Sequence, residues 1–117
     1  MKITKSVVLV FVVGVLGSII SGCRNSENKV KSVILDEGES SAAILEDGSL
    51  YIWGYSGDNQ PVKIMNNVVS ISSGCEHYAA ITTDGNLYTW GDNSYGQLGN
   101  GKTKDSDTPI KVKFPKK

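Results

Sequence analysis

The sequence predicts an all-β fold of antiparallel, four-stranded sheets behind an N-terminal targeting segment, and two observations carry this prediction. The first is an internal repeat: the string from Ala42 to Gly54 recurs 37 residues later, from Ala79 to Gly91, with matching Ala-Ala-Ile, Asp-Gly, Leu-Tyr and Trp-Gly groups. Self-similarity at this period is typical of repeat folds, in which one unit is too small to bury its own apolar face. The second is that nothing after the targeting segment has a helical period.

Residues 1–22 have the pattern of a signal peptide. A short positive region precedes an apolar run of 14 residues, Val7 to Ile20, which is shorter than the roughly 20 residues of a spanning helix. The run ends in Ile20-Ser21-Gly22-Cys23, which resembles the lipobox of bacterial lipoproteins. The resemblance implies cleavage before Cys23, lipid on its sulfur, palmitate-type acylation of the new amine, and anchoring on the extracytoplasmic side of a bacterial cell membrane. An ordinary secretory signal or an uncleaved anchor is the alternative.

The chain that follows the cleavage site has a mildly acidic balance, which argues against nucleic acid as a partner. It keeps 10 of the 12 Lys and Arg and all 12 Asp and Glu, so its formal charge is −2. Residues 23–31 are polar and predict a lipidated tether between membrane and domain. The basic residues gather only at the end, where residues 113–117 predict a solvated tail rather than a binding patch.

Each repeat is expected to hold four short strands, which is typical of a propeller blade or a meander. The strands are predicted at 68–72, 78–83, 87–90 and 109–112 in the second repeat. The first repeat is expected to have outer strands at 30–35 and 61–64 and the same central hairpin. Asp47-Gly48 and Asp84-Gly85 lie between the central runs and predict tight type I′ turns, with positive φ at both residues. Strand alternation should place Tyr88 and Trp90 on the face opposite Leu87 and Thr89.

The two repeats differ in one loop. Seven positions lead from Gly54 to Pro61, but eighteen lead from Gly91 to Pro109. The first repeat, residues 32–64, is therefore a shortened form of the full second repeat, residues 68–112. The eleven extra positions of the second repeat form a glycine-rich loop followed by a charged stretch.

At this loop the second repeat resembles the regulator of chromosome condensation family. The resemblance rests on Ser72–Gly74, His77–Ile81, Asp84-Gly85, Leu87–Asn93 and Tyr95–Gly101. It implies β-propeller blades, packing of Trp90 against a neighbouring blade, and binding of protein partners through loops on the propeller faces. The residues of the repeat signature are Asp47, Gly48, Trp53, Gly54, Gly74, His77, Asp84, Gly85, Trp90, Gly91, Gly96, Gln97, Leu98 and Gly99.

Two blades are an incomplete propeller, since this family usually closes a ring of about seven. Three alternatives remain open: several copies complete a ring as a homo-oligomer, the chain is a truncated paralogue or fragment without independent function, or the pair folds alone. The expected function is that of a membrane-anchored binding or scaffold lipoprotein with a protein partner. The alternative from another class is an inhibitor or accessory of an envelope hydrolase.

No catalytic, cofactor or metal site is expected, so the protein is not predicted to be an enzyme. His77 is the sole histidine; alternation would place it on one face with Cys75, while Glu76 points away, and we expect a structural His77 and a buried Cys75. The acidic loop residues lack the spacing of a calcium loop. Asp92, Asn93 and Tyr95 form a candidate contact loop, although packing between blades is the favoured role for the apolar Tyr95 and Leu98.

Overall fold

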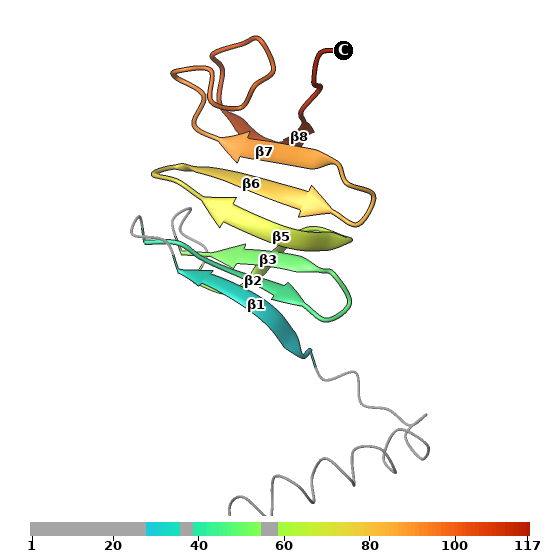
Figure 1. Ribbon diagram of the computed structural model, residues 1–117. Helices are drawn as coiled ribbons and strands as arrows, with labels where there is room; N and C mark the ends of the chain where they lie inside the picture. The colour runs from blue at the N-terminus through green and yellow to red at the C-terminus, as the bar shows by residue number, and fades with distance from the viewer. Residues whose placement is uncertain (1–27, 36–38, 55–58) are drawn as a thin grey trace, which may run out of the picture.

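In a computed structural model, the chain forms two four-stranded antiparallel sheets that follow one another along the sequence (Figure 1). The structure describes residues 28–35, 39–54 and 59–117. The predicted signal peptide, Cys23, most of the predicted tether and part of the shortened loop lie outside these residues. Within the described ranges, no helix has the length and hydropathy needed to cross a membrane.

Neighbouring strands along the chain pair in sequence order in both sheets. The first sheet contains β1 (Val30–Leu35), β2 (Ser41–Leu45), β3 (Leu50–Trp53) and β4 (Val62–Met65). The second sheet contains β5 (Val68–Ser73), β6 (His77–Thr82), β7 (Leu87–Gly91) and β8 (Ser106–Lys111). For the described residues, the prediction of an all-β fold with two four-stranded units is therefore confirmed. The largest boundary difference is in β8, which starts before Pro109 and includes it; β8 is an edge strand, where proline is tolerated.

The hairpin turns differ from the predicted type. In the first sheet the Leu45 N–H donates to the Ser49 carbonyl and the Gly48 N–H donates to the Leu45 carbonyl, both at 2.9 Å. Gly48 has a φ of 85°, whereas Asp47 has no positive φ. This is the pattern of a three-residue loop that ends in a left-handed glycine, not of a type I′ turn. The Ser49 N–H donates to the Asp47 carboxylate at 2.9 Å, which favours this arrangement.

Cross-strand pairing defines which side chains share a face. Ile34, Ala42 and Ile52 lie in one row of the first sheet, and Ile44 and Leu50 lie in the next. We call these five residues the first inner face. In the second sheet, Ile71, Ala80 and Tyr88 lie in one row, and Tyr78 and Trp90 lie in the next. These five form the second inner face. The predicted parity of Tyr88 and Trp90 against Leu87 and Thr89 is confirmed.

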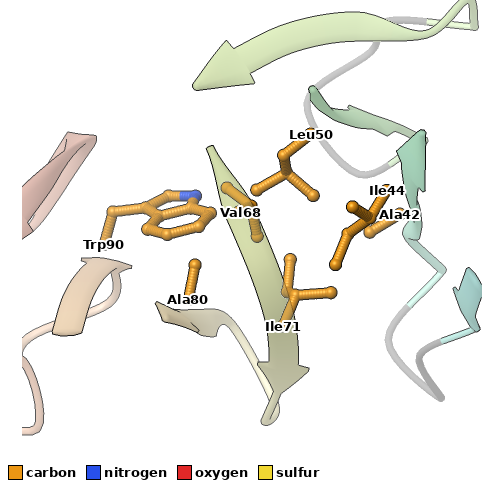
Figure 2. Close-up of a cluster of buried hydrophobic side chains, with 7 residues drawn as sticks. All are labelled: Ala42, Ile44, Leu50, Val68, Ile71, Ala80 and Trp90. Carbon is orange, nitrogen blue, oxygen red and sulfur yellow. The ribbon is translucent and has the colours of Figure 1, made fainter. Parts of the chain in front are cut away.

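The hydrophobic core lies between the two inner faces. Ala42, Ile44 and Leu50 of the first sheet form one buried cluster with Val68, Ile71, Ala80 and Trp90 of the second (Figure 2). Trp90 is only 5% exposed, and Tyr78 stacks on it with ring centroids 5.5 Å apart. Across the sheets, the Tyr78 hydroxyl also donates to the Ser40 hydroxyl. Trp90 therefore packs against the neighbouring sheet, as the family resemblance implies.

The two sheets pack with their strands in the same order. β1 and β2 contact β5, and β4 contacts β8. First strands therefore meet at one edge of the pair, and last strands meet at the other. Adjacent blades of a propeller are arranged in this way.

Candidate interaction surface

The longest connection that the structure describes between two strands is the loop of residues 92–105, which joins β7 to β8. Figure 1 shows it projecting from the second sheet, on the side of the molecule that carries the C-terminus. Its counterpart in the first repeat is shortened. Loops that leave a rigid sheet in this way commonly carry the binding residues of repeat proteins.

The fully buried side chain of Asn93 organises this loop. Its Nδ2 atom donates to the Lys104 carbonyl at 2.9 Å, to the Lys102 carbonyl at 3.0 Å and to Asn100 Oδ1 at 3.2 Å. Its Oδ1 atom accepts the Leu98 N–H at 3.0 Å. Asn93 therefore holds both ends of the loop together. Having no exposed surface, it cannot be a contact residue, and that part of the contact-loop prediction is wrong.

Leu98 attaches the loop to the sheet. Its side chain is fully buried, and its carbonyl accepts a hydrogen bond of 2.8 Å from the Thr89 hydroxyl on β7. The packing role expected for Leu98 therefore agrees with its position. The loop covers the sheet at Thr89, which is also buried.

Tyr95 stands in solvent with 93% of its surface exposed, so it does not pack between the two sheets of this chain. The turn that carries it is held by its polar neighbours. Gln97 Nε2 donates to Asp92 Oδ2 at 2.9 Å, and the Tyr95 N–H donates to Gln97 Oε1 at 2.9 Å. Gly96 follows with a φ of 75°. These contacts use the turn's hydrogen-bonding groups internally and leave the aromatic ring pointing outward.

Carboxylates in the turns have lowered pKa values. The Ser94 hydroxyl and N–H both donate to Asp92, and with Gln97 they hold the pKa of this carboxyl below its usual value. The Thr82 hydroxyl is the main cause of the lowered pKa of Asp84, with Asn86 adding to it. At Asp47 the main cause of the lowered pKa is the Ser49 N–H. The ionised forms of these carboxyls therefore stabilise the folded chain.

Stability is expected to fall on acidification because of these aspartates. Their pKa values in the folded chain lie below the ordinary aspartate value of 3.8. Their contribution is therefore complete above pH 3.8 and is lost as the pH falls through the folded-state values. Urea denaturation between pH 7 and pH 2.5 should show this loss, and Asp84→Asn should reduce it. An unchanged pH profile in that variant would contradict the role of Asp84.

Residues Cys75, Glu76 and His77 lie at the entry to β6. Cys75 is exposed rather than buried, and it lies in a bend before β6, so the alternation expected at Cys75 and Glu76 does not apply. His77 is half-buried against Gly74, where an added Cβ would lie 2.6 Å from its Cε1 atom. Across the residues that the structure describes, no three His, Cys, Asp or Glu residues form a metal-binding group.

The Trp-Gly pairs have the same backbone environment in both repeats. A Cβ at Gly54 would lie 2.4 Å from the Glu39 carbonyl oxygen, and a Cβ at Gly91 would lie 2.3 Å from that of Glu76. Both glycines have positive φ, 112° and 106°. The glutamates Glu39 and Glu76 also have positive φ, 72° and 134°, so both repeats share this irregular backbone before the second strand.

Comparison of the sequence with known families identifies the second repeat. Residues 68–97 and residues 84–117 match two sequence models, each described as the regulator of chromosome condensation (RCC1) repeat. RCC1 repeats are thus detected in this chain. The two matches overlap at the hairpin and the beginning of the loop organised by Asn93.

Three solved structures resemble the pair of sheets. Human WBSCR16 superposes with a TM-score of 0.65 at 29% identity, covering 79% of this chain and 28% of its own. Prp20p from Saccharomyces cerevisiae, described with its binding to Gsp1p and histones, gives 0.68 at 20% identity, over 79% of this chain and 27% of its own. Yeast RCC1 (Prp20), solved bound to Kap60, gives 0.65 at 22% identity, over 80% and 25%.

The two sheets are consistent with two blades of an RCC1-type propeller. The chain spans about a quarter of the length of each of these three structures. The two yeast comparisons concern the fold alone. RCC1 repeats generally serve binding and regulation, so the repeats of this chain suggest a scaffold for protein interaction.

Proposed function

We propose that this protein is a membrane-anchored, extracytoplasmic lipoprotein of a bacterial envelope that uses its RCC1 repeats to bind a protein partner. The anchor is inferred from the lipobox-like end of the signal pattern at Cys23. The binding role is inferred from the repeats and from RCC1-type structures solved or studied with protein partners. The observation that carries it is the exposed Tyr95 on an internally bonded loop.

The loop suits recognition because its shape is set before any partner arrives. The buried Asn93 and the Gln97–Asp92 bond hold the backbone around Tyr95. A rigidly presented tyrosine supplies a large amphipathic contact area with little entropy to lose on binding. Tyr95 is therefore the residue that we place at the centre of the partner contact.

Binding is tested with Tyr95→Ala in the full chain. Wild-type protein and the variant would be cross-linked in the cell envelope and purified, and the co-purifying proteins compared. Loss of a cross-linked partner in Tyr95→Ala, but not in Phe114→Ala, is expected. Phe114 is a matched control because it is an exposed aromatic residue outside the loop. If the wild type yields no reproducible adduct, or if both variants keep it, the role of Tyr95 is refuted.

Anchoring is tested by metabolic labelling with an alkyne analogue of palmitate in a bacterial host. The wild type and Cys75→Ser are expected to take up the label, while Cys23→Ser should lose it and leave the membrane fraction. Cys75 is the control because its thiol is exposed and unpaired. Equal labelling of the wild type and Cys23→Ser would show that Cys23 carries no lipid.

A further inference from the structure

Each sheet has a second apolar face, turned away from the core. On the first sheet, Val33, Ala43 and Tyr51 lie in one row. Leu35 and Trp53 lie in the next row, on either side of Ser41, with which both are paired. We call these five residues the first outer face. Leu35 is 76% exposed and Val33 is 56% exposed, whereas Trp53 is half-buried.

The second sheet presents a smaller apolar face on its far side. Ile81 and Leu87 are paired there, and Ala79 is paired with Thr89. We call these four residues the second outer face. Ile81 is 43% exposed, while Thr89 is covered by the loop through Leu98. The open part therefore consists of Ala79, Ile81 and Leu87.

The internal repeat relates these outer faces to the inner faces. Ala43, Tyr51 and Trp53 are equivalent in the repeat to Ala80, Tyr88 and Trp90, which lie 37 residues later and belong to the second inner face.

The outer face of the second sheet is likewise equivalent to the inner face of the first. Ala79, Ile81 and Leu87 correspond to Ala42, Ile44 and Leu50, which belong to the first inner face. All six pairs are identical residues. Three side chains on each outer face thus recur in one of the two faces that are buried against each other in the core.

We propose that a second copy of this chain docks head-to-tail, with its first outer face on the second outer face of the other copy. The contact repeats the packing already seen between the two sheets. Trp53 of one copy takes the place that Trp90 has in the core, against Ile81 and Leu87 instead of Ile44 and Leu50. Burial of Leu35 and Val33 adds to the stabilisation.

Such a contact joins two different faces, so each dimer still has one free face of each kind. Head-to-tail contacts continue until a ring closes, or they form an open filament. The full chain is therefore expected to associate beyond the dimer as its concentration rises.

Two single substitutions test the contact in the full chain. Leu35→Lys puts a charge on the first outer face, and Ile81→Lys puts one on the second; both sites are exposed enough for the fold to tolerate them. Sedimentation equilibrium in a density-matched mild detergent measures the protein mass. Each variant is expected to associate about a hundredfold more weakly than the wild type, because a buried unpaired charge is costly. Phe114→Lys is the control and should associate like the wild type.

Mixing the two variants distinguishes this geometry from others. The Leu35→Lys chain keeps an intact second outer face, and the Ile81→Lys chain keeps an intact first outer face. An equimolar mixture is expected to give a complex of two chains that grows no further. The double variant should not associate with either single variant.

Several results would overturn the proposal. A wild type that stays monomeric shows that the faces do not bind each other. Association that survives both substitutions places the contact elsewhere, including the apolar N-terminal segment. Loss of association in Leu35→Lys alone indicates a symmetric contact between two first outer faces. Circular dichroism confirms the folding of each variant, and Val33→Lys replaces Leu35→Lys if that variant unfolds.

Discussion

Replacing Trp90 with alanine is expected to lower the free energy of unfolding by about 3–5 kcal/mol. The indole is 5% exposed, stacks on Tyr78, and fills the space between the two inner faces. The substitution removes its apolar area from the core and leaves a cavity between the two sheets. Urea denaturation followed by far-UV circular dichroism measures the loss.

Trp53→Ala is the matched control, since Trp53 holds the same position in the first repeat. Its side chain is half-buried on the first outer face and lies outside the core cluster. At concentrations that keep the chain monomeric, its loss should cost clearly less than that of Trp90. Equal losses would show that the two sheets do not pack through the second inner face.

Replacing Gly91 with alanine is expected to destabilise the chain by more than about 3 kcal/mol. The new Cβ would lie 2.3 Å from the Glu76 carbonyl oxygen and 2.8 Å from the His77 Cα, both of which are backbone atoms that cannot simply rotate away. The φ of 106° adds strain for any residue with a side chain. The Glu76 carbonyl also accepts the Asp92 N–H at 2.8 Å, so a shift there disturbs the start of the loop.

Gly85→Ala separates steric clash from backbone strain. Gly85 has a φ of 79°, but no atom lies within 4 Å of an added Cβ. Its replacement should cost only about 1–2 kcal/mol. The same denaturation measurement compares the two variants, and a Gly91→Ala variant no weaker than Gly85→Ala would refute the close approach to Glu76.

Much of the strand pattern can be predicted from the sequence, because period-two alternation and turn residues are local signals. Tyr88 and Trp90 share a face as their spacing predicts, and β1 has the predicted bounds. The turn type could not be predicted in the same way. Asp-Gly suits a type I′ turn, but a hydrogen bond from the Ser49 N–H to Asp47 accompanies a longer loop with one left-handed residue.

The candidate site was harder to predict, because its residues are defined by contacts along a folded loop. In the sequence, Asn93 is one of several polar loop residues. In the structure it is fully buried, and its side-chain amide donates to the carbonyls of Lys102 and Lys104. Tyr95 and Leu98 are both apolar and three positions apart, but only Leu98 turns towards the sheet. Cys75 is exposed because the chain bends before β6, a feature that strand periodicity does not contain.

By itself the sequence determined the repeating unit: four strands, the positions of the turns between them, and two apolar faces per unit. Only the tertiary structure decided which of those faces are buried. Trp53 and Trp90 have nearly the same local sequence and occupy the same position in their strands, yet Trp90 lies in the core and Trp53 does not. The physical reason is that burial depends on the sheet that lies opposite, and within the described residues a sheet covers only the inner face of each blade.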